Sequence, residues 1–233
     1  GYKNLIKMVS AGFTEGFYNK PRVDHELLEE YHEGLICLSA CLAGEIPQAL
    51  LAGDYEKAKN LARYYEDLFG KGNYYIEIQD HGLDEQRTVL PLLVRLSRET
   101  GIPLVATNDA HYLRREDAES HDVLLCIQTG KTVDDENRMR YEPRNFYLRS
   151  TEEMEELFGA YPDAVANTQR IADRCRMEFT FGKYHLPEFQ LPPGVDSPTY
   201  LRQLCEKGFT ERYGTEHEEY RRQLDYELDM IGR

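Results

Sequence analysis

Three short apolar runs, each about the length of a β-strand, alternate with amphipathic segments of helix length. The apolar runs cover residues 35–41 (LICLSAC), 73–79 (NYYIEIQ) and 102–107 (IPLVAT). Such runs are typical of parallel strands that are buried on both faces. Helices are expected around them, at residues 5–13, 24–31, 45–51, 54–69 and 83–100. Alternation of strands and helices with short connections predicts an α/β fold with parallel strands.

Three strands are too few to close a barrel and few for an open sheet. We therefore expect the missing strands to precede Gly1. The sequence has no initiator Met, and its last three residues fall inside a helical pattern. From these two features we expect this chain to be part of a longer protein.

The pattern changes after Leu113. The sequence predicts a helix at 117–128, an irregular charged segment at 131–144, an extended segment at 145–150, a helix with Thr151 as its cap, and a helix at 162–174. Residues 186–198 contain four prolines and one glycine and read as a linker. A boundary is expected near Leu191, followed by helices at 199–213 and 216–231.

The charge balance limits how this chain can meet nucleic acid. Its formal net charge is −14, from 42 acidic and 28 basic residues. A surface that grips a phosphate backbone is usually basic, so contact with nucleic acid requires a local site, metal ions or another part of a longer protein. No apolar run approaches the roughly 18 residues of a membrane span. Five cysteines do not form a disulfide framework, which favours a reducing, cytoplasmic location without a membrane.

Polar residues gather where the three predicted strands end. Cys41 follows the first strand, Glu77 and His81 lie at the end of the second, and Asp109 and His111 follow the third. Functional residues of parallel α/β folds collect at the carboxyl ends of strands. If the backbone after Thr107 stays extended, the side chains of residues 109 and 111 point to the same side. Thiolate, carboxylate and imidazole groups are ligands for zinc or a similar metal.

Each candidate also has a structural interpretation. Cys41 fits a buried core residue, Asp109 a cap or Asx-turn, and His111 a hydrogen-bonded surface residue. A strand-end salt bridge would explain Glu77 and His81. The charged segment 131–144 fits a solvated loop, although its arginines 138, 140 and 144 could meet a phosphate. Residue chemistry alone thus indicates a metal site without establishing one.

Several longer motifs carry a family resemblance. They are EGLICLSACLAGEIPQALLAGDYEKA, YYIEIQDHGLDEQ, GIPLVATNDAHYLRREDAESHDVLLCIQTGKT, FYLRSTEEMEELF and YPDAVANTQRIADRC. Together they resemble the PHP (polymerase and histidinol phosphatase) region of the bacterial replicative DNA polymerase III alpha subunits, over essentially the whole chain. The closing LPEF and RRQLDYELDMI look like the family's exit toward the polymerase palm.

The resemblance implies a fold and a domain division. The fold is part of a distorted seven-stranded PHP (β/α) barrel that lacks its first strands, followed by a helical segment. The C-terminal part of the PHP domain would occupy residues 1–190, a Pro-rich linker 191–198, and the helical start of the polymerase region 199–233.

The resemblance also implies a ligand set. Cys41, Asp109 and His111 match metal ligands of the family, and Asp109 and His111 would then assist catalysis in the intact protein. The other family ligands, including a His-x-His on the first strand, would precede Gly1. We expect zinc or manganese in this cleft of the intact protein and Mg²⁺ at a polymerase site outside this chain. The chain alone is expected to be inactive.

Two functions remain open for the PHP region of a replicative DNA polymerase subunit. One is a metal-dependent 3′–5′ exonuclease that proofreads DNA, and the intact Cys41, Asp109 and His111 favour it. The other is a non-catalytic module that supports the polymerase and docks a separate proofreading exonuclease. DNA and further replicase subunits such as the sliding clamp are the implied partners. A histidinol-phosphate type phosphatase shares the metal chemistry, but the polymerase-like tail disfavours it.

Overall fold

The computed structural model describes residues 1–184, 186–214 and 217–232. The chain divides into two compact units, Gly1–Met177 and Glu178–Arg233, and each is described by itself. The division lies ahead of the boundary predicted near Leu191. Both positions fall in the segment between the last helix of the first unit and the first helix of the second. The assignment of domains to residues 1–190, 191–198 and 199–233 stays a prediction.

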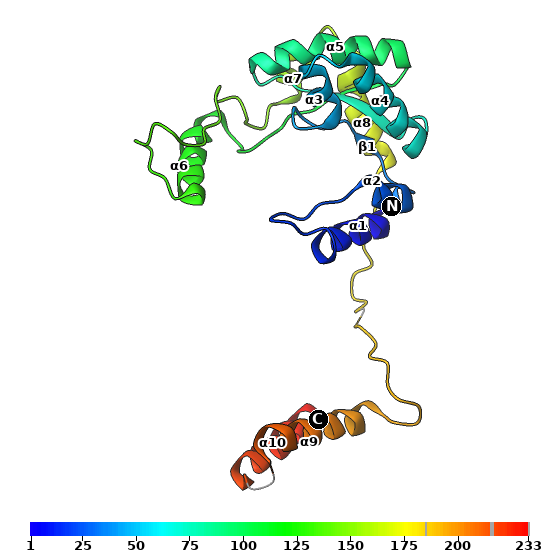
Figure 1. The fold of residues 1–233 in the computed structure, drawn as a ribbon, viewed down its shortest axis with the longest axis vertical. Helices are drawn as coiled ribbons and strands as arrows, with labels where there is room; N and C mark the ends of the chain where they lie inside the picture. The colour runs from blue at the N-terminus through cyan, green and yellow to red at the C-terminus, as the bar shows by residue number, and fades with distance from the viewer. Residues whose placement is uncertain (185, 215–216, 233) are drawn as a thin grey trace. The chain divides into compact units, whose positions relative to one another are not determined.

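The first unit has α/β architecture (Figure 1). In chain order its elements are α1 (Tyr2–Thr14), α2 (His25–Tyr31), β1 (Cys37–Leu38), α3 (Glu45–Leu51), α4 (Tyr55–Phe69), β2 (Tyr74–Ile78), α5 (Asp84–Thr100), β3 (Leu104–Ala106), the 3₁₀ helix η1 (Arg115–Asp117), α6 (Ala118–Thr129), α7 (Thr151–Leu157) and α8 (Pro162–Arg174). The predicted α/β class is confirmed.

The strands form a parallel sheet in the order β1-β2-β3. β1 pairs with the start of β2, where Cys37 is in register with Tyr74. β3 pairs with the end of β2, where Ile78 is in register with Ala106. The two outer strands therefore use different halves of the central strand. This three-stranded sheet, within the residues that the structure describes, confirms neither a closed barrel nor seven strands.

Local signals in the sequence fix several helix ends. The Asp24 and Asp54 carboxylates accept hydrogen bonds from the backbone N–H groups of Leu27 and Lys57, each at 3.0 Å, and so cap α2 and α4. Gly101 ends α5 with φ of 80°, in the left-handed region that glycine enters without a steric penalty. These caps were predicted and are confirmed.

Other boundaries were predicted wrongly. The run 35–41 contributes only two strand residues, because Ala40 takes a φ of 65° and turns the backbone away from the sheet. The segment 145–150, predicted to be extended, contains no helix and forms one isolated bridge, between Tyr112 and Tyr147. The cap of α7 is Ser150 rather than Thr151. Ser150 accepts a hydrogen bond from the Glu153 N–H, and the Glu153 carboxylate accepts one from the Ser150 N–H.

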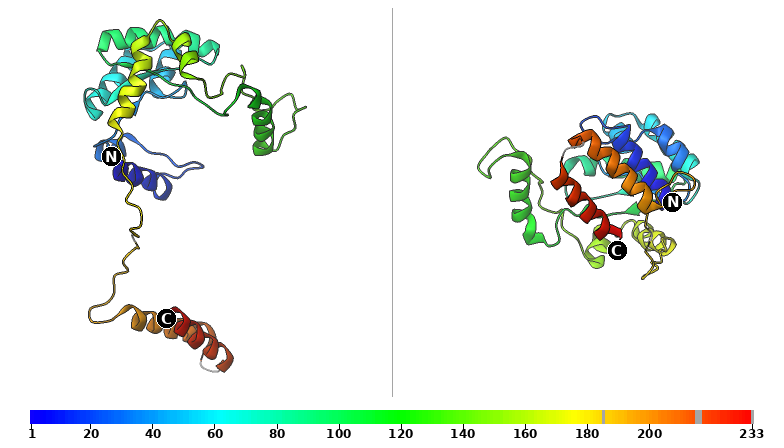
Figure 2. Two further views of the ribbon diagram at one scale, coloured as in Figure 1. Left: turned by 180° about the vertical axis from the view of Figure 1, so that it is seen from behind. Right: turned by 90° about the horizontal axis from the view of Figure 1, so that it is seen from below.

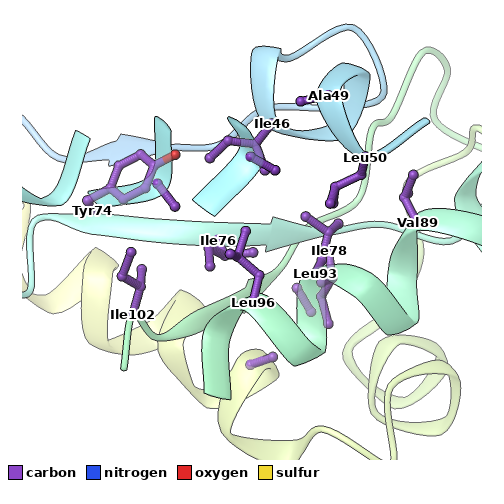
Figure 3. Packing of buried hydrophobic residues seen from close by; sticks show 14 of the residues in the cluster. Ile46, Ala49, Leu50, Tyr74, Ile76, Ile78, Val89, Leu93, Leu96 and Ile102 are labelled. Carbon is purple, nitrogen blue, oxygen red and sulfur yellow. The ribbon is translucent and has the colours of Figure 1, made fainter. Parts of the chain in front are cut away.

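The core of the first unit is built around β2. All five residues of this strand are buried. Figure 3 shows side chains of α3 and α5 meeting Ile76 and Ile78 of β2. Helix α8 packs against β3, and it lies in front in the rear view of Figure 2. The Asn167 side chain of α8 donates a hydrogen bond of 2.7 Å to the Leu104 carbonyl. Because helices cover the faces of the sheet, polar side chains of this unit can gather at the ends of the strands.

The second unit is a helical hairpin of α9 (Ser197–Tyr213) and α10 (Glu218–Gly232). Asp196 caps α9 by accepting a hydrogen bond of 2.9 Å from the Thr199 N–H. Arg202 of α9 forms an ion pair with Asp225 of α10, at 2.9 Å. Both helices were predicted, and Glu216, the predicted start of the second, lies outside the described residues.

The helices of the described ranges include none that combines the length and the apolar character needed to span a bilayer.

Truncation of a side chain in the β2 core should lower stability. Leu96 of α5 is fully buried in the core cluster, and we expect Leu96→Ala to reduce the free energy of unfolding by about 2–5 kcal/mol. Urea denaturation followed by circular dichroism measures this loss. Leu113→Ala, at a position 71% exposed, is the control and should change it by less than about 0.5 kcal/mol. An equal effect of both changes would contradict this account of the core.

An ion-pair group between α4 and α5 should make stability depend on pH. Lys59 and Arg95 lie 2.6 and 2.7 Å from the Glu99 carboxylate and lower its pKa from 4.5 to about 2. A lowered pKa contributes stability that is present above the unfolded value and is lost as pH falls toward 2. In Glu99→Gln, the drop in melting temperature between pH 6 and pH 2.5 should be smaller than in the unaltered chain. Glu85→Gln, at an exposed position of the same helix, should leave the drop unchanged.

Candidate functional site

The carboxyl ends of the three strands bring the predicted site residues to one edge of the sheet. Because the strands are parallel and adjacent, the segments that follow Leu38, Ile78 and Ala106 leave the sheet in the same direction. This edge carries two separate groups of polar side chains. Glu77 and Cys41 belong to the first, and Asp109 and His111 to the second.

The first group lines a small pocket between β1, β2 and α5. Cys41, Glu77, Gln79 and Gln86 contribute its polar surface, and apolar residues of α5, of α3 and of the loop after β1 contribute the rest. Cys41 is half-buried, so its thiol is at a pocket wall rather than deep in the core. The structure thus brings Cys41 together with Glu77.

Neutral hydrogen-bond donors hold the Glu77 carboxylate in place. The Thr107 hydroxyl donates to Glu77 Oε1, and the Gln79 amide donates to the same oxygen at 3.0 Å. Gln79 also donates to Thr107 Oγ1 at 3.0 Å. The Glu77 N–H in turn donates to Ser39 Oγ at 2.9 Å. Glu77 therefore joins the ends of all three strands through hydrogen bonds, and the salt bridge considered from the sequence is not the interaction that holds it.

The second group is the pair Asp109 and His111. Asp109 Oδ1 lies 3.3 Å from His111 Nε2, and their side chains are 39% and 29% exposed. The Ala110 N–H donates to the Asn108 carbonyl at 2.9 Å, which makes a three-residue turn centred on Asp109. The two side chains meet because the backbone turns, so the extended geometry assumed from the sequence was wrong although the proximity was right.

Aromatic rings surround His111. Its ring centroid lies 4.5 Å from that of Tyr141, 5.7 Å from His121 and 5.6 Å from Phe146. The His111 N–H also donates to the Phe146 carbonyl at 2.7 Å. His121 belongs to α6, and Tyr141 and Phe146 belong to the segment after it, which pairs with Tyr112 through Tyr147. The three rings pack around the imidazole, and the Phe146 carbonyl holds the backbone of His111.

His81 is the fully buried member of this edge. Its ring stacks on Phe146 with centroids 4.5 Å apart, and Gln86 contacts His81 Nδ1 at 3.0 Å. Burial lowers the pKa of the His81 imidazole, the Arg149 guanidinium lowers it further, and the Asp109 carboxylate opposes this shift. His81 Nε2 has no hydrogen-bond partner among the described residues. Since Phe146 contacts both histidines, His81 belongs to the Asp109–His111 side of the edge.

The proposed metal ligands are only partly gathered. Asp109 and His111 lie together, whereas Cys41 lines the pocket with Glu77. Within the described ranges no three His, Cys, Asp or Glu residues form a group that could hold a metal ion. By themselves, the described residues therefore do not form a complete set of metal ligands. The metal roles of Cys41, Asp109 and His111 stay predictions.

Reasoning from the sequence missed the residues that support these groups. Gln79, Thr107 and Gln86 hold Glu77 and His81, and Arg149 donates to Asn108 Oδ1 at 3.3 Å. Gln79 and Thr107 end predicted strands, so the strand-end rule could have found them. Arg149 lies in a distant part of the sequence, and no local signal indicates its contact.

Comparison with known proteins gives the family. The family described as PHP domain matches residues 1–81, which end at His81. DNA polymerase III subunit alpha of Treponema pallidum is 49% identical over 234 residues, which cover 100% of this chain and 20% of that protein. The same subunit of Borreliella burgdorferi is 44% identical over 99% of this chain and 20% of its own length. That of Deinococcus radiodurans is 43% identical over 91% of this chain and 16% of its own length.

The chain belongs to the DNA polymerase III alpha family. It spans about a fifth of the length of these relatives. The family resemblance read from the motifs is thereby confirmed. For a polymerase III alpha segment that includes PHP sequence, the carboxyl edge of the sheet is the place where site chemistry is expected.

The thiols of this unit should differ in reactivity. Burial raises the pKa of the Cys37 thiol to about 11, and the Glu77 carboxylate adds to this shift. Because the thiolate is the nucleophile, iodoacetamide at pH 8 should alkylate the exposed Cys175 quickly and leave Cys37 unmodified. Peptide mass spectrometry measures both, with Cys175→Ser as the control that removes the fast signal. Equal alkylation of the two positions at pH 8 would contradict the buried environment of Cys37.

Proposed function

We propose that this chain is part of the alpha, or polymerase, subunit of DNA polymerase III and that its parent protein synthesises DNA in chromosomal replication. The observation that carries the proposal is the match of the whole chain to subunits of that name at 44–49% identity. The parent would act as a DNA-directed DNA polymerase in the cytoplasm, with Mg²⁺ at a polymerase site outside this chain. DNA and replicase subunits such as the sliding clamp would be its partners.

We further propose that the PHP region gives the parent a metal-dependent 3′–5′ exonuclease. In this proposal the three strands form part of a seven-stranded barrel, and Asp109, His111 and Cys41 supply some of the ligands for zinc or manganese. The 3.3 Å contact between Asp109 and His111 supports a shared role at the strand edge. Such ions, when bound, activate water and stabilise negative charge on a phosphodiester. The remaining ligands would come from parts of the parent outside this chain.

The chain's own residues have supporting roles in this proposal. The turn at Asp109 sets the distance between its carboxylate and the imidazole. The Phe146 carbonyl holds the backbone N–H of His111, and the Tyr141 ring packs against its imidazole. Gln79 and Thr107 hold Glu77 as an acceptor beside Cys41. Positions fixed before the substrate binds lower the reorganisation that a reaction requires.

A second candidate is a structural module that supports the polymerase and docks a separate proofreading exonuclease. The observation in its favour is that the ligands do not form a three-residue group within the described residues. In that case Asp109 and His111 stabilise the turn after β3, and the buried sheet serves as a scaffold.

Asp109→Asn in the full-length parent separates the two functions. If Asp109 is a ligand, the change should reduce bound zinc or manganese and slow digestion of a 3′-mismatched primer by about 100-fold, while primer extension continues. Elemental analysis gives the metal content, and gel assays follow both reactions. Asp134→Asn, which removes an acid of the charged loop, is the matched control and should change none of these readouts.

The outcomes assign the role. A parent that binds no zinc or manganese, and that digests mismatched primers only when a separate exonuclease is added, would establish the structural module. Retained metal together with unchanged digestion in Asp109→Asn would remove Asp109 from the exonuclease proposal. Absence of primer extension by the unaltered parent would contradict the polymerase assignment itself.

A further inference from the structure

A small pocket between α6 and the loop that follows it contains three arginines. Arg138, Arg140 and Arg144 line it together with Tyr112 and His121. We call this the arginine pocket. Its volume of about 30 Å³ has room for one or two oxygen atoms, since a water molecule needs at least about 10–15 Å³ on the same scale. The pocket is therefore too small for a base or a sugar and fits the oxygens of an anionic group.

Arg138 forms the buried floor of the arginine pocket. Its side chain is 4% exposed, and its two terminal nitrogens donate to the Asp122 carboxylate at 2.5 and 2.6 Å. Arg138 Nε is buried and has no acceptor among the described residues. A buried donor without an acceptor is costly, and an oxyanion is the ligand type that would satisfy it.

The other two arginines of the arginine pocket keep donors available. Arg140 is exposed, and one of its terminal nitrogens donates to the Asp135 carbonyl at 3.2 Å. Arg144 is 56% exposed and faces Glu119 at 3.5 Å, where Glu119 is itself 83% exposed. Exposed pairs of this kind are weak, so a phosphate can replace them. The forked guanidinium group matches phosphate oxygens in bidentate geometry.

Acidic groups also face the arginine pocket. Asp122 and Glu142 line it, and Glu119 and Asp135 lie beside it. Asp122 is occupied by Arg138 through both of its oxygens, so Arg140 and Arg144 are the remaining cations of the lining and Glu142 is its remaining anion. Two exposed arginines against one remaining carboxylate leave the lining with an excess of positive charge that can attract an anion from solvent.

The position of the arginine pocket ties it to the strand edge. Two of its lining residues, Tyr141 and His121, contact the His111 ring at 4.5 and 5.7 Å between centroids. A phosphate held by Arg140 and Arg144 would therefore be separated from His111 by the ring of Tyr141 or His121. A DNA strand whose scissile bond is at Asp109 and His111 would have further phosphates at such a distance along its backbone.

We propose that the arginine pocket binds a backbone phosphate of single-stranded DNA. The proposal rests on the proposed exonuclease function for its choice of DNA as the source of the phosphate. It explains how a chain of net charge −14 can contact DNA: through a few arginines at one place rather than through its whole surface.

Binding of a short oligonucleotide tests the arginine pocket without any catalysis. The 233-residue chain is titrated against a fluorescein-labelled poly-dT of about twelve nucleotides at low salt, and fluorescence anisotropy gives the dissociation constant. We expect Arg140→Gln with Arg144→Gln to weaken binding about tenfold. The slope of log affinity against log salt should fall by about 0.7 for each phosphate that the variant no longer neutralises. Replacement of both residues by lysine should recover part of the affinity, because charge remains while the fork is absent.

Arg63→Gln with Arg87→Gln is the matched control. It removes the same charge from exposed positions of α4 and α5 and should change the affinity less than twofold. Circular dichroism confirms that each variant is folded. Equal weakening by the two double variants would overturn the proposal, since it would show that only net charge matters. Pocket-dependent binding of inorganic phosphate, with unchanged oligonucleotide affinity, would overturn the assignment to DNA. Because the assay measures binding and not digestion, it can succeed or fail whether or not the parent protein is an exonuclease.

Discussion

The pairing of both outer strands with β2 is the constraint on which the rest of the first unit depends. β1 uses the first half of β2 and β3 uses the second half, so one five-residue strand carries all the pairing of the sheet. A strand in this position must be buried on both faces, because helices have to cover each side of a parallel sheet. Ile76 and Ile78 accordingly lie in the core with the apolar faces of α3 and α5. The polar side chains of this region therefore gather at the strand ends.

The stagger of the strands explains why the edge has two groups. β1 ends opposite Tyr75, near the start of β2, and after the turn at Ala40 the side chain of Cys41 lines the same pocket as Glu77. β3 ends beside the end of β2, so Asp109 and His111 lie farther along. Thr107 and Gln79 stand between the two groups and hydrogen-bond Glu77. Neutral donors thus satisfy the Glu77 carboxylate within the first group, without a buried charge pair and its desolvation cost.

Local chemistry in the sequence predicted the helices well and the strands less well. Capping side chains such as Asp54 and the glycine after α5 act within one turn, so their effect can be read from neighbouring residues. An apolar run such as 35–41 indicates burial but does not show where the backbone leaves the sheet. The turn occurs at Ala40, and because this residue is not a glycine the sequence gives no signal for it. The strand-end rule placed Cys41, Glu77, Asp109 and His111 at one edge of the sheet, which is where the structure has them. It could not separate Cys41 from His111, because their distance depends on strand stagger, which is set by long-range packing.

The partners of the Asp109–His111 pair come from residues far along the chain, and this has a consequence for charge. The segment that supplies Tyr141 and Phe146 also carries the arginines that line the adjoining pocket. Within it, the one deeply buried guanidinium is neutralised by Asp122, which spares the fold an uncompensated charge. The exposed guanidinium groups need no such compensation and stay free to exchange partners. An acidic surface keeps other anions at a distance by simple repulsion, so a few local arginines can select where an anionic strand is held.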